Sequence, residues 1–386
     1  MPNLDQLHRS AREIFDAALA SVDPRRAVAQ AIVRDGPVVE VCGERFDASS
    51  TQIFAIALGK AAAAMAHGVE DALGDKLTRG VISAPAFSDP LSRHWEIFAG
   101  GHPLPNEASI EAAEAAFNVL DWANDVRGVV ICLVSGGGSA MFEYPKSPSI
   151  SLDDLRRENE LLIVGGARIS EINEVRRTFS AVKGGQLVQY APDARFVTLI
   201  VSDTNRGDEA NVASGPTLPS DSPYEVLLGN WTALEAAHQK AIELGFTSST
   251  IAEDICEQPI QDGCDLLLAA VKNTHCLISG GEFSCPVRGP GVGGRNLETV
   301  LRLAMDLDQQ AVVLSAGTDG IDGNSPAAGA IADQTTIARA QSLGLDPAEF
   351  LARSDSYTFF ERLNDLIVTG PTGTNVRDLR IFITSS

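Results

Sequence analysis

Long apolar runs and basic residues are both scarce in this chain of 386 residues. No stretch approaches the roughly 18 consecutive apolar residues that a membrane-spanning helix needs. The amino terminus has a helical rhythm without a continuous apolar core, so we expect neither a membrane span nor a signal peptide. Lys and Arg number 30 against 51 Asp and Glu, which gives a net charge of -21. Because this charge repels phosphate backbones and anionic lipids, we expect neither nucleic acid nor a membrane as a partner.

Cysteine is also sparse, and its spacing excludes several kinds of site. The cysteines form no CxxC pair, the chain is too long to need disulfide staples, and the histidines form no HExxH motif. We therefore expect reduced thiols, a cytoplasmic location, and oxygen ligands for any metal ion. The cysteines are Cys42, Cys132, Cys256, Cys264, Cys276 and Cys285.

Apolar runs alternate with amphipathic stretches, which predicts an α/β layered architecture. Short apolar runs of this kind are typical of strands that are buried on both faces of a parallel sheet. The first 35 residues predict two helices, the second with a cap at Asp23 and a first-turn proline at Pro24. The other expected helices are 60–73, 106–124, 152–164, 170–178 and 231–244, and the expected strands are 52–58, 129–134, 196–201, 276–279 and 312–316.

The length of the chain predicts two or three domains. Turn-rich segments lie at 216–223 and 253–263, and glycine becomes denser after residue 270, where a new series of strands begins. We therefore expect a large α/β domain over residues 1–270 and a smaller α/β domain over residues 271–386.

Glycine clusters follow the predicted strands, at the ends where α/β sheets bind ligands. The sequence SGGGS after the strand 129–134 suits a phosphate, because the backbone N–H groups of a glycine-rich turn converge on an anion. A tight turn that packs a strand against a helix is the alternative. We expect phosphate or substrate contacts from Ser135, Gly136, Gly137, Gly138 and Ser139.

Other glycine motifs exclude or weaken familiar nucleotide sites. The pair Gly59-Lys60 lacks the upstream glycine of a Walker A motif, which excludes P-loop machinery. A literal GxGxxG occurs at 289–294, but Pro290 lies inside it and no acidic residue is placed for a ribose hydroxyl. The SxxK match at 180–183 lacks the companion motifs of the serine β-lactamases, and we attribute it to chance.

Two basic residues stand where a bound anion would favour them. Lys60 follows a predicted strand at the first helical position, where a lysine works against the positive end of the helix unless a phosphate or carboxylate binds there. Arg295 has the same kind of position after GVGG, and its guanidinium could grip a carboxylate with two hydrogen bonds. A solvated side chain is the alternative for each residue.

Carboxylates also gather at the predicted strand ends. Asp203 follows the strand 196–201, Glu282 follows SGG, and Asp319 and Asp322 lie in GTDGIDG. Such positions hold Mg²⁺ through one or two carboxylates plus substrate phosphates. For each residue alone a turn or a helix cap is the commoner explanation, but their joint placement favours a metal.

Several segments, spread over residues 5–380, form a recognisable set. They are LGKAAAAM, GGHPLPNEAS, LVSGGGSA, INEVRRTFSAVKGGQL, SDTNRGDEANVASGPTLP, SGGEFSCPVRGPGVGGRNLE, SAGTDGIDGNSPAAGA and TGPTGTNVRDL. In this order they resemble the motifs of the class II glycerate kinases. The resemblance implies a glycerate 2-kinase that converts D-glycerate to 2-phosphoglycerate with ATP and Mg²⁺.

The resemblance also implies an architecture and residue roles. It implies a large Rossmann-like domain, a smaller MOFRL domain at 271–386, and an active-site cleft between them. The lysine of the family's GKAA motif falls on Lys60, and the arginine of its GGRNQE motif falls on Arg295. We expect both to act on the transferring phosphoryl group or the glycerate carboxylate. We expect a proton acceptor or Mg²⁺ ligand among Asp203, Glu282 and Asp319.

The chain departs from the family pattern in two loops. It reads SDTNRGDEA where members more often read close to SDVPGDDP, and RGPGVGG where RGKGRGG is common, so a basic pair is missing before Arg295. If that pair binds nucleotide in the family, nucleotide affinity or choice differs here. The remaining residues expected to contact nucleotide are Lys183, Gly293, Gly294 and Asp319.

Two other functions remain open from the sequence. Some family members have carried the label hydroxypyruvate reductase, an NAD(P)H-dependent activity, but no proton donor and no acidic ribose contact can be placed for it. A catalytically idle sensor of sugar acids or nucleotides is the third interpretation. The sequence leaves the glycerate enantiomer, the phosphorylated hydroxyl, the range of donors and assembly into a homodimer undecided.

Overall fold

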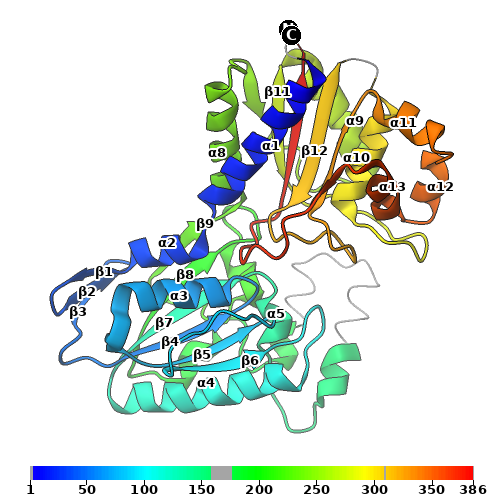
Figure 1. Ribbon diagram of the computed structural model, residues 1–386. Helices are drawn as coiled ribbons and strands as arrows, with labels where there is room; N and C mark the ends of the chain where they lie inside the picture. Colours follow the sequence, from blue (N-terminus) through cyan, green and yellow to red (C-terminus); the bar gives the residue numbers. More distant parts are fainter. Residues whose placement is uncertain (1–2, 158–175, 308–309, 386) are drawn as a thin grey trace. The chain divides into compact units, whose positions relative to one another are not determined.

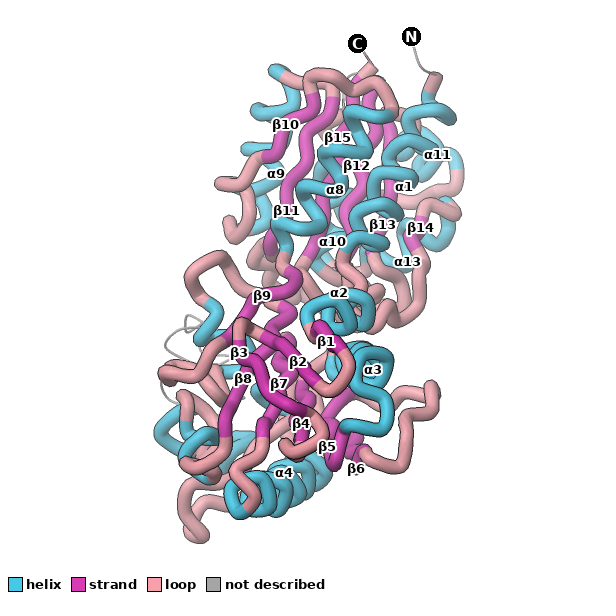
Figure 2. The backbone as a smooth tube through the Cα atoms, turned by 90° about the vertical axis from the view of Figure 1, so that its left-hand side faces the viewer, coloured by secondary structure: helices cyan, strands magenta, loops and turns pink. Residues whose placement is uncertain are grey.

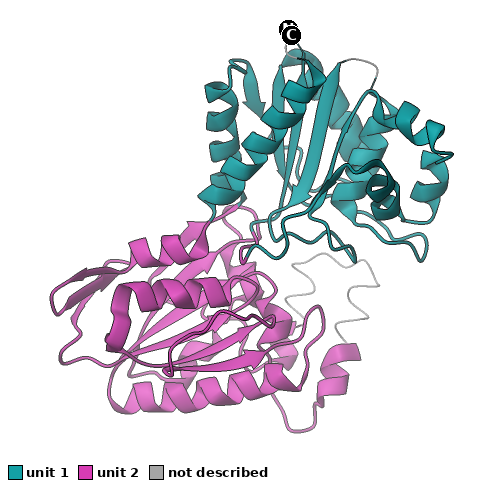
Figure 3. Cartoon of the chain, in the orientation of Figure 1, with its two compact units in different colours: residues 1–22, 230–372, 376–386 teal, residues 23–229, 373–375 magenta. Residues whose placement is uncertain are grey.

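The chain divides into two units, each assembled from segments that are distant in the sequence. The computed structural model describes residues 3–157, 176–307 and 310–385. The boundary expected at residue 270 falls inside unit 1, at the end of the helix α9 (Ile260–Ala270). Unit 1 contains Met1–Val22, Asn230–Thr372 and Val376–Ser386, and unit 2 contains Asp23–Gly229 and Gly373–Asn375 (Figure 3).

Unit 2 is built on a six-stranded parallel sheet in the order β6-β5-β4-β7-β8-β9 (Figure 1). The chain adds β5 and β6 on one side of β4 and then β7, β8 and β9 on the other, which is the strand order of a Rossmann fold. The predicted Rossmann-like domain is thereby confirmed. The strands are β4 (Ile53–Leu58), β5 (Leu77–Ala84), β6 (Trp95–Ala99), β7 (Val129–Ser135), β8 (Arg195–Val201) and β9 (Tyr224–Leu228).

Helices cover both faces of this sheet. Every residue of β4 and β7 is buried, and the helices α3 (Ala62–Leu73) and α4 (Glu107–Asp125) lie on opposite faces (Figure 1). This double cover explains the continuous apolar runs in the sequence. Unit 2 also contains α2 (Pro24–Ala31), the short helix α5 (Gly138–Met141), and a small antiparallel sheet of β1 (Val33–Asp35), β2 (Val38–Val41) and β3 (Glu44–Asp47).

Unit 1 is built on a mixed sheet in the order β10-β11-β15-β12-β13-β14. Only β10 and β11 pair in parallel. Helices α1 and α8 lie over one face of this sheet (Figure 2), and α10 packs on β12 and β13. The strands are β10 (Ser249–Ile251), β11 (Cys276–Gly281), β12 (Ala311–Gly317), β13 (Gly329–Asp333), β14 (Leu366–Ile367) and β15 (Asp378–Thr384), and the helices besides α9 are α1 (Leu4–Ser21), α8 (Asn230–Glu243), α10 (Arg295–Met305), α11 (Thr336–Ser342), α12 (Pro347–Ala352) and α13 (Ser356–Leu363).

The N-terminal helix α1 explains why the units differ from the expected domains. Its apolar face, which includes Leu7, Ile14 and Phe15, is buried, and the helix packs on β12 and β15. His8 on the same helix bonds Asp333 of β13 at 2.7 Å. Because α8 also packs on β11 and β15, segments on both sides of unit 2 in the sequence complete the core of unit 1.

Strand β15 is absent from the predicted elements, and it changes the sheet of unit 1. Its sequence DLRIFIT begins with alternating polar and apolar residues, as a half-exposed strand does, yet every residue is buried. It lies between β11 and β12 and is antiparallel to both. The parallel arrangement expected of all predicted strands therefore holds in unit 2 but not in unit 1. The sequence does not predict β15 because the charged residues Asp378 and Arg380 are unusual in a central strand.

Several smaller expectations have clear outcomes. Asp23 caps α2 by accepting the Arg26 N–H group, and Pro24 is its first residue, as predicted. Residues 152–157 of the expected helix 152–164 and residues 176–178 of the expected helix 170–178 are helical, and the remainder of both lies outside the described residues. Along the described segments, no helix is long and apolar enough to cross a membrane. The six cysteines are all free, as expected of reduced thiols.

Candidate active site

The carboxyl ends of β4 and β7 meet where the strand order of unit 2 reverses. In open α/β sheets this reversal leaves a crevice in which ligands bind. Lys60 follows β4, and residues 136–138, here called the first glycine loop, follow β7. The Lys60 N–H group donates to the Gly136 carbonyl at 2.8 Å, and the Ala61 N–H group donates to Ser135 Oγ at 3.1 Å. The topology therefore brings the predicted lysine and the predicted phosphate loop together.

Glycine is required where these turns touch. A Cβ atom on Gly59, whose φ is 106°, would lie 2.3 Å from the Ser135 carbonyl oxygen, and one on Gly136 would lie 1.9 Å from Asp203 Oδ2. Both distances are far inside van der Waals contact, so no larger residue fits without displacing its neighbours. Gly136 thereby allows the loop backbone to lie directly against the predicted carboxylate just beyond β8.

The first glycine loop has backbone donors without an acceptor in the described part of the chain. Within residues 3–157, 176–307 and 310–385, the N–H groups of Gly136, Gly137 and Gly138 have no acceptor. A buried N–H group without a partner costs free energy, and Gly136 and Gly138 are buried. Successive N–H groups in a glycine turn form an anion-binding concavity. The loop therefore has the backbone chemistry expected of a phosphate or carboxylate site.

Two further side chains approach this loop. A Cβ atom on Gly137 would lie 3.2 Å from Lys60 Cγ and 3.2 Å from His102 Cδ2. We expected Lys60 at the first helical position. Helix α3 instead begins at Ala62 with Ala61 as its N-cap residue, so Lys60 lies in the turn that precedes the helix. The turn between β4 and α3, and not the helix, sets the position of the lysine.

A strained segment supports the other side of the first glycine loop. Ala213 and Ser214 have φ values of 50° and 61°, which residues other than glycine rarely adopt. Ser214 Oγ lies 2.8 Å from Ser139 Oγ, and a Cβ atom on Gly138 would lie 2.8 Å from Ala213 Cβ. Ser139, predicted to contact the ligand, therefore bonds this segment and helps to fix the loop.

Lys183 and Ser135 have protein partners as well. Lys183 is 1% exposed, and its ammonium group pairs with Glu143, which is 2% exposed. Burial lowers the pKa of Lys183, and the charge of Glu143 opposes that shift. The Ser135 hydroxyl is buried and donates to the Leu58 carbonyl at 3.0 Å. Both side chains support the interior of unit 2, and a nucleotide contact by either remains a prediction.

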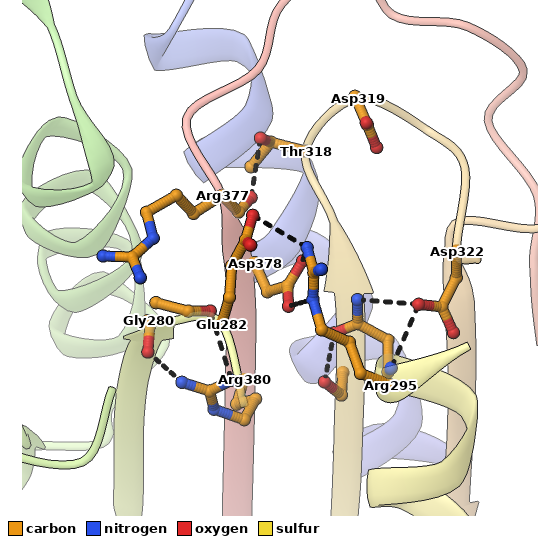
Figure 4. A network of polar contacts seen from close by, with 12 residues as sticks. Gly280, Glu282, Arg295, Thr318, Asp319, Asp322, Arg377, Asp378 and Arg380 are labelled. Carbon is orange, nitrogen blue, oxygen red and sulfur yellow. Dashed lines mark hydrogen bonds and ion pairs between the residues drawn. The ribbon is translucent and has the colours of Figure 1, made fainter. Parts of the chain in front are cut away.

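Arg295 of unit 1 is held by two carboxylates (Figure 4). Its Nε lies 2.5 Å from Asp378 Oδ2, and one terminal nitrogen lies 3.1 Å from Asp378 Oδ1 and 2.8 Å from Glu282 Oε1. Asp378 is buried, whereas the Glu282 side chain is 35% exposed. Burial opposes the charge on Arg295, but the two carboxylates raise its pKa above the usual value. Arg295 is therefore a fixed cation at the start of α10.

Asp322 caps this helix. Its carboxylate accepts the N–H groups of Asn296 at 3.1 Å and Leu297 at 2.8 Å, and the residue is 2% exposed. Burial raises the pKa of Asp322 to about 7, and the neighbouring charge of Asp378 adds to the rise, while the two backbone hydrogen bonds oppose it. The protein's own carboxylate thus takes donors at the helix start that would otherwise suit a phosphate.

Protein acceptors also close the segment 289–294, here called the second glycine loop. The Gly291 N–H group donates to the Arg353 carbonyl at 3.0 Å, and the Gly293 N–H group donates to Asn324 Oδ1 at 2.9 Å. A Cβ atom on Gly294 would lie 2.4 Å from the Asp322 side chain, so glycine serves close packing here. This GxGxxG has the geometry of a packed turn, and nucleotide contacts by Gly293 and Gly294 remain predictions.

The carboxylates expected to bind metal are engaged in different ways. Across the described residues, no group of three or more His, Cys, Asp or Glu side chains is arranged for a metal ion. Glu282 pairs with Arg295, and Asp319 Oδ1 accepts the Ile321 N–H group at 3.2 Å. Asp203 lies against the first glycine loop. One such carboxylate fits Mg²⁺, which takes its other ligands from phosphate oxygens and water.

Two buried charged residues of this region are absent from the predicted site. Both lie on β15: Asp378 holds Arg295, and Arg380 bonds Ser279 Oγ at 2.9 Å and the carbonyl of Gly280 (Figure 4). Charged residues rarely lie inside a buried strand without partners. Opposite charges two positions apart in DLRIFIT, on one face of a strand, are the signal that indicates such a network.

Comparison with known proteins places both units in one family. The domain of unknown function DUF4147 matches residues 10–243, and the MOFRL family matches residues 275–378. A D-glycerate 2-kinase of Thermotoga maritima is 32% identical over 98% of each chain. A putative hydroxypyruvate reductase of Agrobacterium vitis is 34% identical over 96% of this chain and 93% of its own. The crystal structure of a Thermotoga maritima glycerate kinase has a TM-score of 0.84 at 29% identity, over 99% of this chain and 100% of that one. Since both family models and these full-length relatives agree, the chain belongs to the class II glycerate kinase family.

Proposed function

We propose that this chain is a glycerate 2-kinase that transfers the γ-phosphoryl group of ATP to the 2-hydroxyl of D-glycerate. The observation that carries the proposal is the first glycine loop, whose N–H groups lack acceptors in the described part of the chain and lie beside Lys60. Phosphoryl transfer depends on positioned charge more than on covalent chemistry. A loop of free donors next to a lysine, in a chain similar to D-glycerate 2-kinase along its length, supplies such charge.

Each charged group has a role in this proposal. Lys60 and the first glycine loop neutralise the transferring phosphoryl group or the glycerate carboxylate. Arg295, held by Asp378, presents a rigid guanidinium to the same kind of anion. Asp203 accepts the proton of the attacking hydroxyl or binds the metal. That Lys60 and Arg295 serve one reaction is a prediction, which the double variant described below tests.

Mg²⁺ fits the proposal through Asp203, which lies against the first glycine loop. When bound, it neutralises phosphate charge, which matters in a chain of net charge -21 because that field repels ATP. The other two candidates belong to unit 1, where Glu282 pairs with Arg295 and Asp319 accepts the Ile321 N–H group.

A hydroxypyruvate reductase fits the structure less well. A nicotinamide dinucleotide binds a Rossmann sheet at a glycine fingerprint after the first strand, but β4 is followed by Gly59, Lys60 and Ala61. The GxGxxG of the second glycine loop follows β11 in unit 1, where protein acceptors take the N–H groups of Gly291, Val292 and Gly293. Neither the turn after β4 nor the second glycine loop therefore provides the dinucleotide-binding loop that a reductase needs.

A product assay tests the proposal. The purified chain is incubated with ATP, Mg²⁺ and D-glycerate, and enolase is added, which acts on 2-phosphoglycerate but not on 3-phosphoglycerate. An enolase signal reports both the kinase activity and the phosphorylated hydroxyl. ADP release without that signal would move the assignment to another hydroxyl or acceptor. NADH oxidation with hydroxypyruvate, in place of ADP release, would overturn the kinase.

A further inference from the structure

A cavity of about 380 Å³ lies beside Arg295 and is lined entirely by residues of unit 1. Its walls come from the segment 283–294, the start of α10, the turn 322–324 and the segment 354–356. Pockets of about 300–1,000 Å³ hold molecules the size of a drug or a nucleoside. Glycerate is a much smaller molecule, so the cavity has the size of a donor site and not of an acceptor site.

One wall of this cavity is apolar and rigid. It contains Phe283, Pro286 and Val287, and Val287 lies at the mouth because it lines the cavity while 83% exposed. The Arg380 guanidinium lies 3.9 Å from the centroid of the Phe283 ring, and a Cβ atom on Gly263 would lie 2.4 Å from the same ring. A ring fixed in this way offers a ready apolar surface to a planar base.

The cavity is also lined by a serine. Ser356 lines the cavity and is 2% exposed. A Cβ atom on Gly293 would lie 2.5 Å from its Oγ atom, so the hydroxyl lies against the second glycine loop. A hydroxyl group can both donate and accept a hydrogen bond, and this one can therefore bond a ligand in the cavity.

Arg295 gives the cavity a cation, and the carboxylates of Asp322 and Glu298 also line it, the latter paired with Arg288 and Arg302. The Arg295 side chain is 35% exposed and lines the cavity together with the glycines of the second loop. We propose that this cavity binds the nucleoside of the phosphoryl donor, with the base against Phe283 and Val287, a hydrogen bond to Ser356, and the phosphates toward Arg295. This inference rests on the proposed kinase function and names the donor subsite within it.

Two variants test the proposal by titration calorimetry with ATP and, separately, with inorganic tripolyphosphate. Ser356→Ala removes the hydroxyl group, so we expect about a fivefold loss of ATP affinity, no change for tripolyphosphate, and no loss of thermal stability. Val287→Asp places a charge at the apolar mouth, and we expect about a tenfold loss for ATP and a much smaller one for tripolyphosphate. Val33→Asp, at a 58% exposed valine of β1 in unit 2, is the matched control and should bind both ligands like the wild type.

The outcomes separate this inference from the proposed function. Wild-type ATP affinity in both variants, with the kinase active, would overturn the donor subsite and leave the kinase intact. Equal losses for ATP and tripolyphosphate in Val287→Asp would also overturn it, because the added charge alone would then explain the effect. A wild-type chain that neither binds ATP nor releases ADP with D-glycerate would instead overturn the kinase itself.

Discussion

The two glycine loops are both rich in glycine, but they differ in whether protein oxygens accept their backbone N–H groups. In the first loop, the N–H groups of residues 136–138 have no acceptor within the described segments. In the second, the N–H groups of Gly291, Val292 and Gly293 all donate to protein oxygens. The first loop follows a strand at the reversal of a parallel sheet, where a ligand is expected. A glycine motif therefore indicates a ligand only where its donors are left over, and elsewhere it serves close packing.

The cations beside the two loops differ in a related way. Arg295 is fixed by a buried carboxylate and a half-exposed one, whereas Lys60 lies in the turn before α3, beside the first glycine loop. A planar guanidinium that is already held loses little freedom when it binds an anion. We therefore expect Arg295 to orient a substrate group.

Removing Lys60 should give the largest effect. We expect Lys60→Ala to lower kcat by about 10³-fold, because charge at the transferring group is lost, while the free energy of unfolding changes by less than about 1 kcal/mol. Lys272→Ala, at an exposed lysine of unit 1, is the control for charge removal. If Arg295 serves the same reaction, the double variant Lys60→Ala with Arg295→Ala will lose less than the product of the single losses. Normal turnover in Lys60→Ala would end the assignment.

Alanine in each glycine loop tests the contrast directly. Gly136→Ala places a methyl group 1.9 Å from Asp203 Oδ2, so we expect kcat/KM for D-glycerate to fall by about 100-fold as donors and carboxylate are displaced. Gly293→Ala places one 2.5 Å from Ser356 Oγ, and we expect a severalfold rise in the KM for ATP with kcat nearly unchanged. Melting curves of both variants show whether folding is affected. The reverse order of effects on kcat would contradict the contrast between the loops.

The carboxylate behind Arg295 should have a smaller effect on turnover. Asp378→Asn leaves the guanidinium without its bidentate partner, and we expect kcat to fall by about tenfold to thirtyfold. Asp365→Asn is the matched control, because Asp365 holds Arg339 of the same unit with contacts of 2.6 and 3.2 Å. Both variants lose an ion pair and should lose stability, but only Asp378→Asn should lose activity. Equal kinetics in the two variants would reduce Asp378 to a structural residue.

The sequence predicts much of unit 2 because its signals are local. The strands predicted there, β4, β7 and β8, contain continuous apolar runs, and Lys60 and the first glycine loop stand at strand ends that these runs define. The strands β5, β6 and β9 mix polar and apolar residues and are absent from the prediction. The role of Asp378 is not local, since its partner Arg295 lies 83 positions away. Whether a loop N–H group is free or bonded also depends on distant residues, such as Asn324 for the second glycine loop. The residue types at a strand end can be predicted from the sequence. The hydrogen bonds that satisfy a loop's N–H groups, or leave them without acceptors, are known only from the fold.

The smallest effect concerns the cap that holds the second glycine loop and α10 in place. Asp322 has its pKa raised by burial from 3.8 to about 7. The folded chain therefore holds a proton that the unfolded chain has lost between about pH 4 and pH 7. The stability from this proton is fully present below pH 4 and is lost as the pH rises through 7. We expect the free energy of unfolding of the wild type, relative to Asp322→Asn, to fall by on the order of 1 kcal/mol per pH unit across this window.

This pH window separates Asp322 from the carboxylates that pair with cations. Burial alone would raise the pKa of Asp378, but Arg295 lowers it. The contribution of Asp378 to stability therefore changes only below about pH 4 and does not vary between pH 4 and pH 7. Denaturant unfolding at several pH values, with kcat measured on the same samples, provides the comparison. A difference between wild type and Asp322→Asn that does not vary from pH 4 to 7 would mean that Asp322 stays ionised. The second glycine loop would then lie beside a negative charge that repels the phosphates of the donor. The affinity of the protein for ATP should in that case rise when Asp322→Asn removes the charge.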